Sequence, residues 1–170
     1  MQALNRQQVR LIGFDVVFSE EEINPVTRVL ATGQVTTQTA AELQQLMPRL
    51  DGDQQFAGVI GRNTVLGYLL HNTGGIHAGM LPTPFLKVDE KDKNRLSVNF
   101  MPDYTGLLPL FAQHALSAGF VSTLPDADGV MRRSPLILRY ENGVYSALSL
   151  ELARQYLNAP YVKLVTVNSG

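Results

Sequence analysis

Residues 9–18, VRLIGFDVVF, form an almost unbroken run of apolar and β-branched residues. Such a run is too short to cross a bilayer, and it is typical of a β-strand that is buried on both faces. Residues 64–71, TVLGYLLH, have the same character. Strands of this kind need other elements on both sides, so the pattern favours a sheet that is covered by helices.

Helix signals follow the first apolar run. Asn24 is suited to the N-cap position, Pro25 to the first helical residue and Gly33 to the position behind the end of a short helix. Thr39 and Glu42 have the spacing of a capping box, which predicts the start of a second helix. Pro48 is expected to end or bend this helix.

The rest of the chain predicts further elements of both kinds. Helices are expected over residues 54–60, over 107–118 with Thr105 as cap and Gly119 as stop, and from Ser146 to Leu157. Strands are expected over residues 95–100, 120–124, 130–140 and after Pro160, with a tight hairpin turn at Glu141-Asn142-Gly143. This order predicts an α/β fold: a mixed β-sheet flanked by helices in a layered sandwich, with a β-hairpin near the C-terminal third.

Length, charge and cysteine content restrict the class of protein. The 170 residues suit a single domain, and a net charge of −1 provides no basic field that would attract nucleic acid as a partner. The chain has no cysteine, which excludes disulfides, cysteine-bound zinc, iron–sulfur clusters and a thiol nucleophile. Both ends resemble interrupted elements, so we expect one domain over residues 1–170 that is truncated at both ends.

The segment LPDADGVMRRSPL, residues 124–136, admits a metal loop, an anion site or a turn. Asp126, Asp128 and Gly129 match three positions of a calcium-binding loop, but the same frame puts Leu124 and Pro135 where oxygen ligands are required. We therefore interpret the segment as a turn in which an aspartate binds local amides and Gly129 adopts a positive φ.

Arg132 and Arg133 lie in a predicted strand, where consecutive side chains point to opposite faces. The inward guanidinium would need a partner, and Asp15 in the middle of the first strand has the same requirement with the opposite sign. We hypothesise that one of these arginines, or loop amides, meets Asp15. A structural role for such a pair is favoured over a functional one.

No catalytic, metal-binding or cofactor-binding motif is present. His71 and His77 flank NTGG with a spacing that matches no metalloenzyme pattern, and His114 lies on a predicted helix. Phosphate-binding loops, nucleophile elbows and dinucleotide fingerprints are absent from the sequence. The sequence therefore indicates no catalytic residues, no metal and no cofactor.

Two segments nevertheless resemble a known family. IGFDVVFSE, residues 12–20, is similar to the strand and acidic turn of the CHASE sensory domains of the second subtype. Residues 118–157 resemble the other hallmark of that family, a Gly-Phe-Val strand, Asp-x-Asp-Gly-Val, paired arginines, an apolar strand and a helix. The matching positions are Gly13, Asp15, Phe18, Ser19, Glu20, Asp126, Asp128, Gly129, Arg132 and Arg133. The resemblance is weak over residues 34–60, and the strand and helix that usually precede IGFD are missing.

The resemblance implies an extracytoplasmic sensory input domain, on the periplasmic or extracellular face of a membrane-bound signalling protein. The cytoplasmic output would be an adenylate or guanylate cyclase, a histidine kinase or a similar enzyme, and this domain itself would not be an enzyme. Its partners would be an unknown small-molecule ligand or protein signal and, in the intact receptor, a second copy in a homodimer. The membrane would be met only through flanking segments.

Two other functions stay open. One is a small α/β hydrolase or transferase that uses Asp15, Glu20 and a cleft histidine, and the other is a protein-binding or dimerisation module. If a small ligand exists, we expect it near Ser19, Glu20 and Arg132 or Arg133, where charges of both signs meet turn amides.

Overall fold

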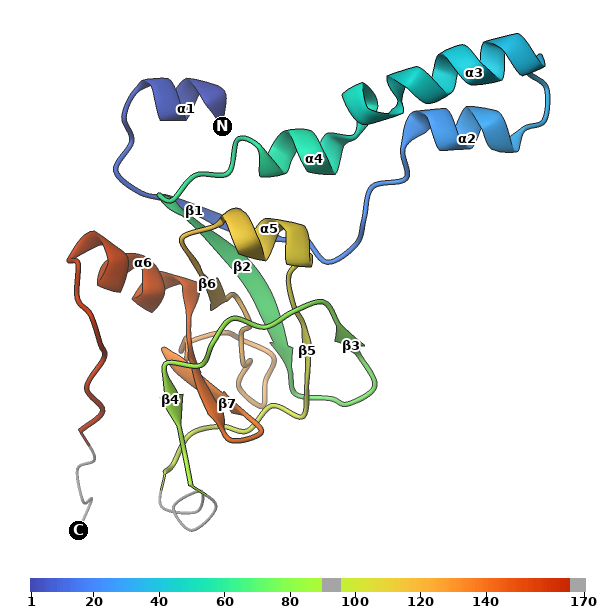
Figure 1. Cartoon of the computed structure of the whole chain (residues 1–170). Coiled ribbons are helices and arrows are strands. Elements are labelled where there is room, and N and C mark those ends of the chain that lie inside the picture. Colours follow the sequence, from blue (N-terminus) through green and yellow to red (C-terminus); the bar gives the residue numbers. More distant parts are fainter. Residues whose placement is uncertain (90–95, 166–170) are drawn as a thin grey trace.

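The computed structural model describes residues 1–89 and 96–165 (Figure 1). Its helices are α1 (Gln2–Arg6), α2 (Pro25–Ala31), α3 (Thr37–Leu46), the 3-10 helix η1 (Met47–Leu50), α4 (Gly52–Ala57), α5 (Pro109–His114) and α6 (Leu148–Tyr156). Its strands are β1 (Ile12–Val17), β2 (Thr64–His71), β3 (His77–Ala78), β4 (Leu86–Lys87), β5 (Asp103–Thr105), β6 (Ser117–Phe120), β7 (Ile137–Tyr140) and β8 (Gly143–Ser146).

Strand β2 is the centre of the larger, mixed sheet. Parallel strands β1 and β6 flank it, with Leu66 opposite both Phe14 and Ala118. Strand β5 pairs antiparallel with the last residues of β2, and β3 runs parallel to β5. A second, antiparallel sheet has the order β4-β8-β7. The prediction of a mixed α/β architecture is therefore confirmed.

The core forms where β2 and β6 face the helices. Tyr68, Phe111, Phe120 and Leu138 are among its fully buried side chains. A cluster of phenylalanine rings continues it toward the end of β1, with edge-on contacts between ring centroids 5.3–6.0 Å apart and one tilted contact at 5.0 Å. The cluster joins β1, α4 and α5, and its members are Phe14, Phe18, Phe56 and Phe111. Edge-on packing of this kind contributes beyond the burial of area.

Gly119 does not end a helix as predicted, because it lies inside β6. Helix α6 begins directly against this strand, and a Cβ on Gly119 would lie 2.5 Å from the Cα of Leu148. Helix α5 is correspondingly short and ends at His114, and Thr105 belongs to β5 instead of capping it. The close approach of α6 to β6 thus requires glycine for space, not for a helix stop.

The prediction that the first strand is buried on both faces is wrong. In β1 only Ile12 is buried, and Asp15 and Val16 are exposed. The strand is apolar yet has a single neighbour, β2, among the described residues. By contrast, the expectation for β2 is correct, since six of its eight residues are buried.

Helices α2 and α3 form an arm that extends away from the sheets (Figure 1). Asn24 caps α2 by accepting a hydrogen bond from the amide of Val26, and Gly33 follows the helix with φ +66°, as predicted. The second helix starts earlier than predicted, because Thr36 and not Thr39 is its N-cap. None of the side chains of α3 is buried.

The predicted hairpin is present as β7 and β8, with Tyr140 paired with Gly143. Its two loop residues are therefore Glu141 and Asn142, which lie within the predicted turn, and Glu141 has φ +49°. Ser146 ends β8 and does not cap α6, whose N-cap is Ala147.

Two further predicted strands do not form. Phe100 makes one isolated bridge to Arg139, but residues 96–100 form no strand, and residue 95 lies outside the described residues. Residues 161–165 after Pro160 have no regular structure, and the remaining five residues of that predicted strand are likewise outside the described part. Among the helices of the described chain, none has the length and apolar character to cross a membrane.

Candidate functional site

A cavity of about 530 Å³ lies beside the first turns of α6, and we call it the α6 pocket. Its walls come from residues 80–85, from the C-terminal end of α5, from the start of β6, from the end of β8 and from residues 160–162. The volume falls within the range of small-molecule sites, about 300–1,000 Å³. Segments far apart in the sequence thus meet around one hollow.

Glu151 and Arg154 form an ion pair in the wall of the pocket. The Arg154 guanidinium donates through Nε and Nη2 to the two carboxylate oxygens of Glu151, at 2.9 and 2.6 Å. Gln155 donates to the same carboxylate at 2.9 Å and the Ser146 hydroxyl at 3.4 Å. The exposed fraction of the side chain is 7% for Glu151 and 23% for Arg154, so the pair is largely removed from water.

These contacts decide the charge of Glu151. Burial by itself would raise the pKa of its carboxyl, but the hydrogen bonds from Arg154 and Gln155 outweigh it, and the pKa lies below its usual value. The same pairing raises the pKa of the Arg154 guanidinium. Both groups are therefore charged at neutral pH.

Two residues that line the pocket, Tyr68 and Ser117, carry buried hydroxyls without a hydrogen-bond partner in the described chain. Tyr68 is fully buried in β2, and its Oη has no hydrogen-bond partner among the described residues. The Ser117 hydroxyl lies close enough to Glu151 to contribute to lowering the pKa of that carboxyl, but no hydrogen bond of acceptable geometry is formed. Buried polar groups are normally paired, so unpaired ones in a cavity wall point to a missing partner.

The alternation of β2 places the Tyr68 hydroxyl at this end of the core. Leu66, Tyr68 and Leu70 share one face of the strand and belong to the main core cluster. The Tyr68 ring meets the Tyr145 ring edge-on, with centroids 6.4 Å apart. Burial, followed by the proximity of Tyr145 and Glu151, raises the pKa of Tyr68 well above its ordinary value, so its hydroxyl keeps its proton.

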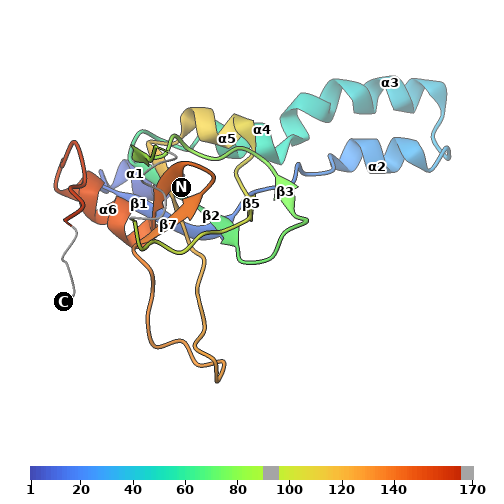
Figure 2. The same cartoon turned by 90° about the horizontal axis from the view of Figure 1, so that it is seen from below.

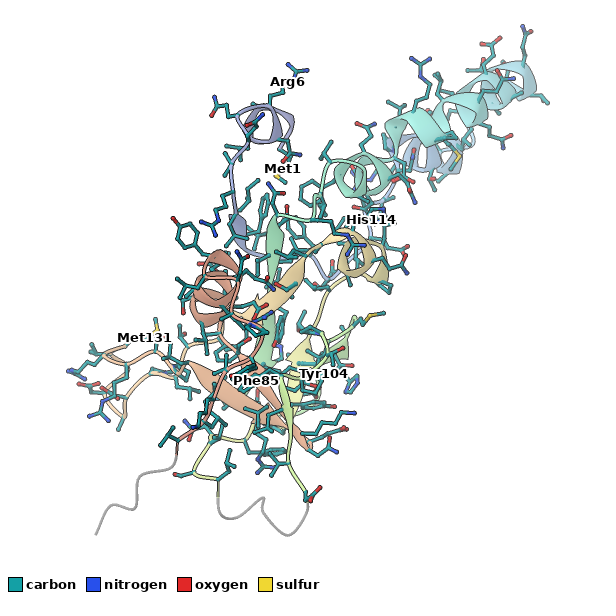
Figure 3. All side chains as sticks on the ribbon, turned by 60° about the vertical axis from the view of Figure 1, so that its left-hand side comes forward. Met1, Arg6, Phe85, Tyr104, His114 and Met131 are labelled. Atoms are coloured by element: carbon teal, nitrogen blue, oxygen red, sulfur yellow. The ribbon has the colours of Figure 1, made fainter. Side chains whose placement is uncertain are left out.

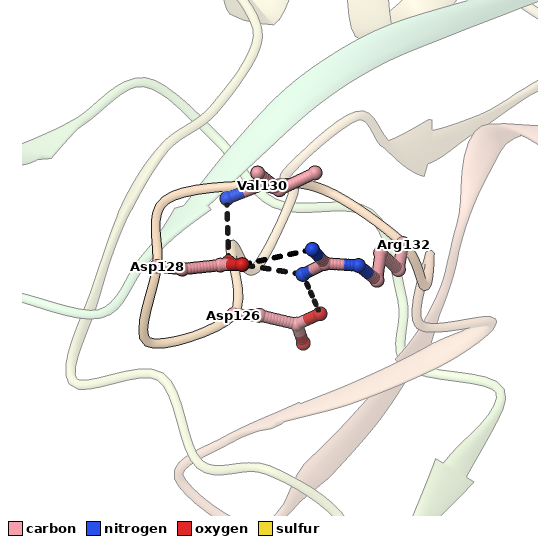
Figure 4. Close-up of polar contacts among 4 residues, drawn as sticks. All are labelled: Asp126, Asp128, Val130 and Arg132. Carbon is pink, nitrogen blue, oxygen red and sulfur yellow. Dashed lines mark hydrogen bonds and ion pairs between the residues drawn. The ribbon is translucent and has the colours of Figure 1, made fainter.

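The segment with the paired arginines forms a loop that projects away from the sheets (Figure 2). Arg132 donates to Asp128 at 2.8 and 2.9 Å and to Asp126 at 3.1 Å (Figure 4). Asp128 also accepts a hydrogen bond from the amide of Val130, and Gly129 has φ +79°, which confirms the turn interpretation. The pKa of Asp128 is lowered mainly by its hydrogen bonds from Arg132 and to a smaller extent by the one from the Val130 amide.

The strand predicted over residues 130–140 is confined to β7, so Arg132 and Arg133 do not face opposite sides of a sheet. Both side chains are exposed in the loop, where the turn around Gly129 holds the chain away from β-pairing. The hypothesis that one of them meets Asp15 is wrong. Asp15 is exposed and needs no partner, while Arg132 is occupied by Asp126 and Asp128.

The four residues expected near a small ligand are not joined by direct contacts. Ser19 and Glu20 follow β1, just beyond Phe18, whose carbonyl accepts the amide of Leu108 before α5. Within residues 1–89 and 96–165, no hydrogen bond or ion pair links Ser19 or Glu20 to Arg132 or Arg133. As a ligand site they remain a prediction.

Other signature positions have structural surroundings. Gly13 lies against α6, and a Cβ there would come within 2.7 Å of the Leu152 side chain. Phe18 belongs to the phenylalanine cluster. These two positions let α6 and α5 approach the first strand closely.

His77 lies beside a buried carboxylate at the end of the mixed sheet. Its Nδ1 is 3.4 Å from Asp103 Oδ1, and its ring centroid is 4.2 Å from that of Tyr104. Figure 3 labels Tyr104 on its strand. Burial would raise the pKa of Asp103, but the amides of Tyr104, Gly75 and Ile76 donate to it and lower the pKa. The hydrogen bonds from Gly75 and Ile76 to Asp103 attach the loop before β3 to strand β5. In the described residues no group of three potential metal ligands is found.

No sequence pattern singles out Glu151, Arg154 or Tyr68. An acid and a base three residues apart on a predicted helix usually form a solvated surface pair. Leu148 on this helix is buried, whereas Ala153 and Tyr156 are exposed. Only the packing of α6 against β6 and β8 buries Glu151.

A family model described as the CHASE2 domain matches residues 1–168 of the chain. No curated protein and no solved structure matches it.

Proposed function

The chain belongs to the CHASE2 domain family, whose members are extracytoplasmic sensory domains of signalling proteins, and we propose that its α6 pocket receives the signal as a small molecule. We further propose that it is the input of a membrane-bound receptor with a cyclase or histidine kinase as cytoplasmic output. The family is sensory and not catalytic. A hydrolase or transferase that uses Asp15, Glu20 and a histidine does not fit this family.

The observation that carries this proposal is the buried ion pair in the wall of a cavity. Arg154 donates not only to Glu151 but also, through Nη1, to the carbonyl of Ala159 at 3.0 Å. Residues 160–162, which follow directly, complete the wall of the pocket. A molecule in the pocket would thus touch the segment that leaves α6 and would favour one arrangement of it.

This arrangement supplies what a sensor needs in thermodynamic terms. A ligand shifts a conformational equilibrium only by its difference in affinity for the two states. If residues 157–162 have a second arrangement in which the pocket is open, a ligand that contacts them in the closed arrangement has such a difference. The ion pair would connect the occupied pocket with the end of the helix.

The test measures both binding and its consequence for this segment. The full chain is screened with small molecules by thermal shift, since a ligand that binds the folded state raises the melting temperature. Hydrogen exchange then reports the protection of residues 157–162 with and without each stabilising compound. Ala112→Leu, which extends a wall residue into the cavity, provides the blocked variant.

We expect at least one compound to raise the melting temperature of the wild-type chain and to protect residues 157–162, with both effects lost in Ala112→Leu. Equal effects in the two proteins would contradict the proposal. Gln113→Leu, at an exposed position next to Ala112 on α5, serves as the matched control and should respond like the wild type.

Self-association is a second candidate function, and the arm formed by α2 and α3 favours it. Val29 and Leu46 on this arm, and Leu50 in the adjoining η1, are 40–43% exposed, although all three are large and apolar. We propose that a second copy of the chain covers them in the homodimer expected for an intact receptor. Sedimentation of Leu46→Glu should show a weaker dimer than the wild type, whereas Leu4→Glu on α1, equally exposed, should not.

A further inference from the structure

We infer that the α6 pocket selects an electrically neutral molecule with an apolar body and one hydroxyl or carbonyl group, which the hydroxyl of Tyr68 binds. This inference rests on the proposed sensory function and specifies its ligand class. Three features of the pocket lead to it: its charges are already paired, two buried hydroxyls are not, and about half of its wall is apolar.

The charge on the wall is internally compensated. The two carboxylate oxygens of Glu151 accept hydrogen bonds from Arg154, Gln155 and Ser146. Arg154 is engaged by this carboxylate and by the carbonyl of Ala159. An anion would have to compete with Glu151 for the guanidinium, and a cation would have to compete with Arg154 for the carboxylate. Because a buried charge without a partner is strongly unfavourable, either exchange would leave one wall group unpaired.

Tyr68 provides a hydroxyl that lacks a hydrogen-bond partner in the described chain and can bind a ligand in the pocket. Its Oη is buried and has no partner in the described chain, and the high pKa keeps it protonated, so it can donate a hydrogen bond. A ligand hydroxyl or carbonyl oxygen accepts such a bond, whereas a hydrocarbon cannot. The Ser117 hydroxyl, also buried and unpaired, lies near Glu151 and can accept a bond from a ligand hydroxyl or donate one to a ligand carbonyl.

The remaining wall favours an apolar body. Leu107, Ala115 and Ala118 are buried hydrophobic residues that line the cavity, and Phe85 and Tyr145 add aromatic faces. Ligand pockets of this kind bind mainly through apolar contact, with a few polar groups that fix the orientation. One polar group on an apolar body therefore matches the composition of the wall.

Four probes that share a phenyl ring separate the possibilities. They are benzyl alcohol, toluene, benzoate and the benzylammonium ion, titrated into the full chain and followed by ¹H–¹⁵N correlation NMR. Amides that line the pocket, such as those of Ser117 and Tyr145, report binding there. We expect benzyl alcohol to bind more tightly than toluene, and the two ions to produce no saturable shift of these amides.

Tyr68→Phe removes the unpaired hydroxyl and keeps the ring, so the fold should be retained or slightly stabilised. Losing one hydrogen bond should weaken the binding of benzyl alcohol about fivefold and leave the binding of toluene unchanged. Tyr156→Phe, on the exposed side of α6, is the matched control and should leave both affinities unaltered.

The outcomes are distinguishable. Tighter binding of benzoate or benzylammonium than of benzyl alcohol would overturn the neutral ligand class but keep the pocket as the sensory site. Equal affinities of benzyl alcohol and toluene, unaffected by Tyr68→Phe, would overturn the role of the hydroxyl. Shifts of the pocket amides by none of the four probes would overturn this inference and count against the proposed function as well.

Discussion

The ion pair between Glu151 and Arg154 makes a prediction whose size and pH dependence both follow from the structure. Arg154→Leu leaves the Glu151 carboxyl, with a side chain 7% exposed, without its cationic partner. Removing one member of a buried pair typically costs about 3–5 kcal/mol, because the other charge stays behind. The carboxyl has an alternative, however, since it can take up a proton and become neutral.

Protonation of Glu151 sets an upper limit on the loss of free energy of unfolding in Arg154→Leu. With an ordinary pKa of 4.5 in the unfolded chain, neutralising this carboxyl at pH 7 costs about 3.4 kcal/mol at roughly 1.4 kcal/mol per pH unit. At pH 5 the same step costs only about 0.7 kcal/mol. We therefore expect Arg154→Leu to lower the free energy of unfolding by about 3 kcal/mol at pH 7 and by clearly less at pH 5.

The wild-type chain should respond to pH in the opposite sense. The folded-state pKa of Glu151 is lowered, so its contribution to stability is present above the unfolded pKa of about 4.5 and is lost as the pH falls through the folded value. The advantage of the wild type over Arg154→Leu should thus shrink on acidification. Urea unfolding followed by far-ultraviolet circular dichroism at pH 7 and pH 5 measures both quantities.

The double variant Glu151→Leu/Arg154→Leu completes the test. Apolar replacement of both partners of a buried pair is often neutral or stabilising, so the double variant should be more stable than either single one. Arg132→Leu, in an exposed pair with Asp128, is the control and should change stability little at either pH. A cost of Arg154→Leu that is the same at pH 5 and pH 7, or a double variant no more stable than the single ones, would refute the reasoning.

Three further predictions concern the framework of the site. Gly119→Ala puts a Cβ against the backbone of Leu148 and should reduce stability by about 1–3 kcal/mol, as for an overpacked core, with a drop in melting temperature in a thermal scan. Asn24→Ala removes the cap of α2 and should cost about 1 kcal/mol, which urea unfolding detects, whereas Asn24→Ser should restore most of it. Arg132→Gln should loosen the projecting loop without unfolding the domain, so limited proteolysis should become faster within residues 124–136 while the melting temperature stays unchanged.

Local signals in the sequence predicted several elements correctly. The Asn24 cap and Gly33 delimit α2 because they act on neighbouring backbone groups, which no distant residue needs to support. The run of residues 64–71 is mostly apolar because β2 is enclosed on both faces. The turn around Gly129 is likewise a local arrangement of aspartates, amides and a positive φ. The family could also be recognised, since its signature lies in such short segments.

Tertiary structure decided everything that depends on which elements pack together. The apolar run of β1 reads like that of β2, yet Asp15 is exposed because β1 has only one strand neighbour in the described chain. Gly119 reads like a helix stop, but the close approach of α6 is what requires it. The α6 pocket is the clearest case. Glu151 and Tyr68 lie 83 positions apart, and only the packing of α6 across β6 brings a buried charge pair and an unpaired hydroxyl into one cavity.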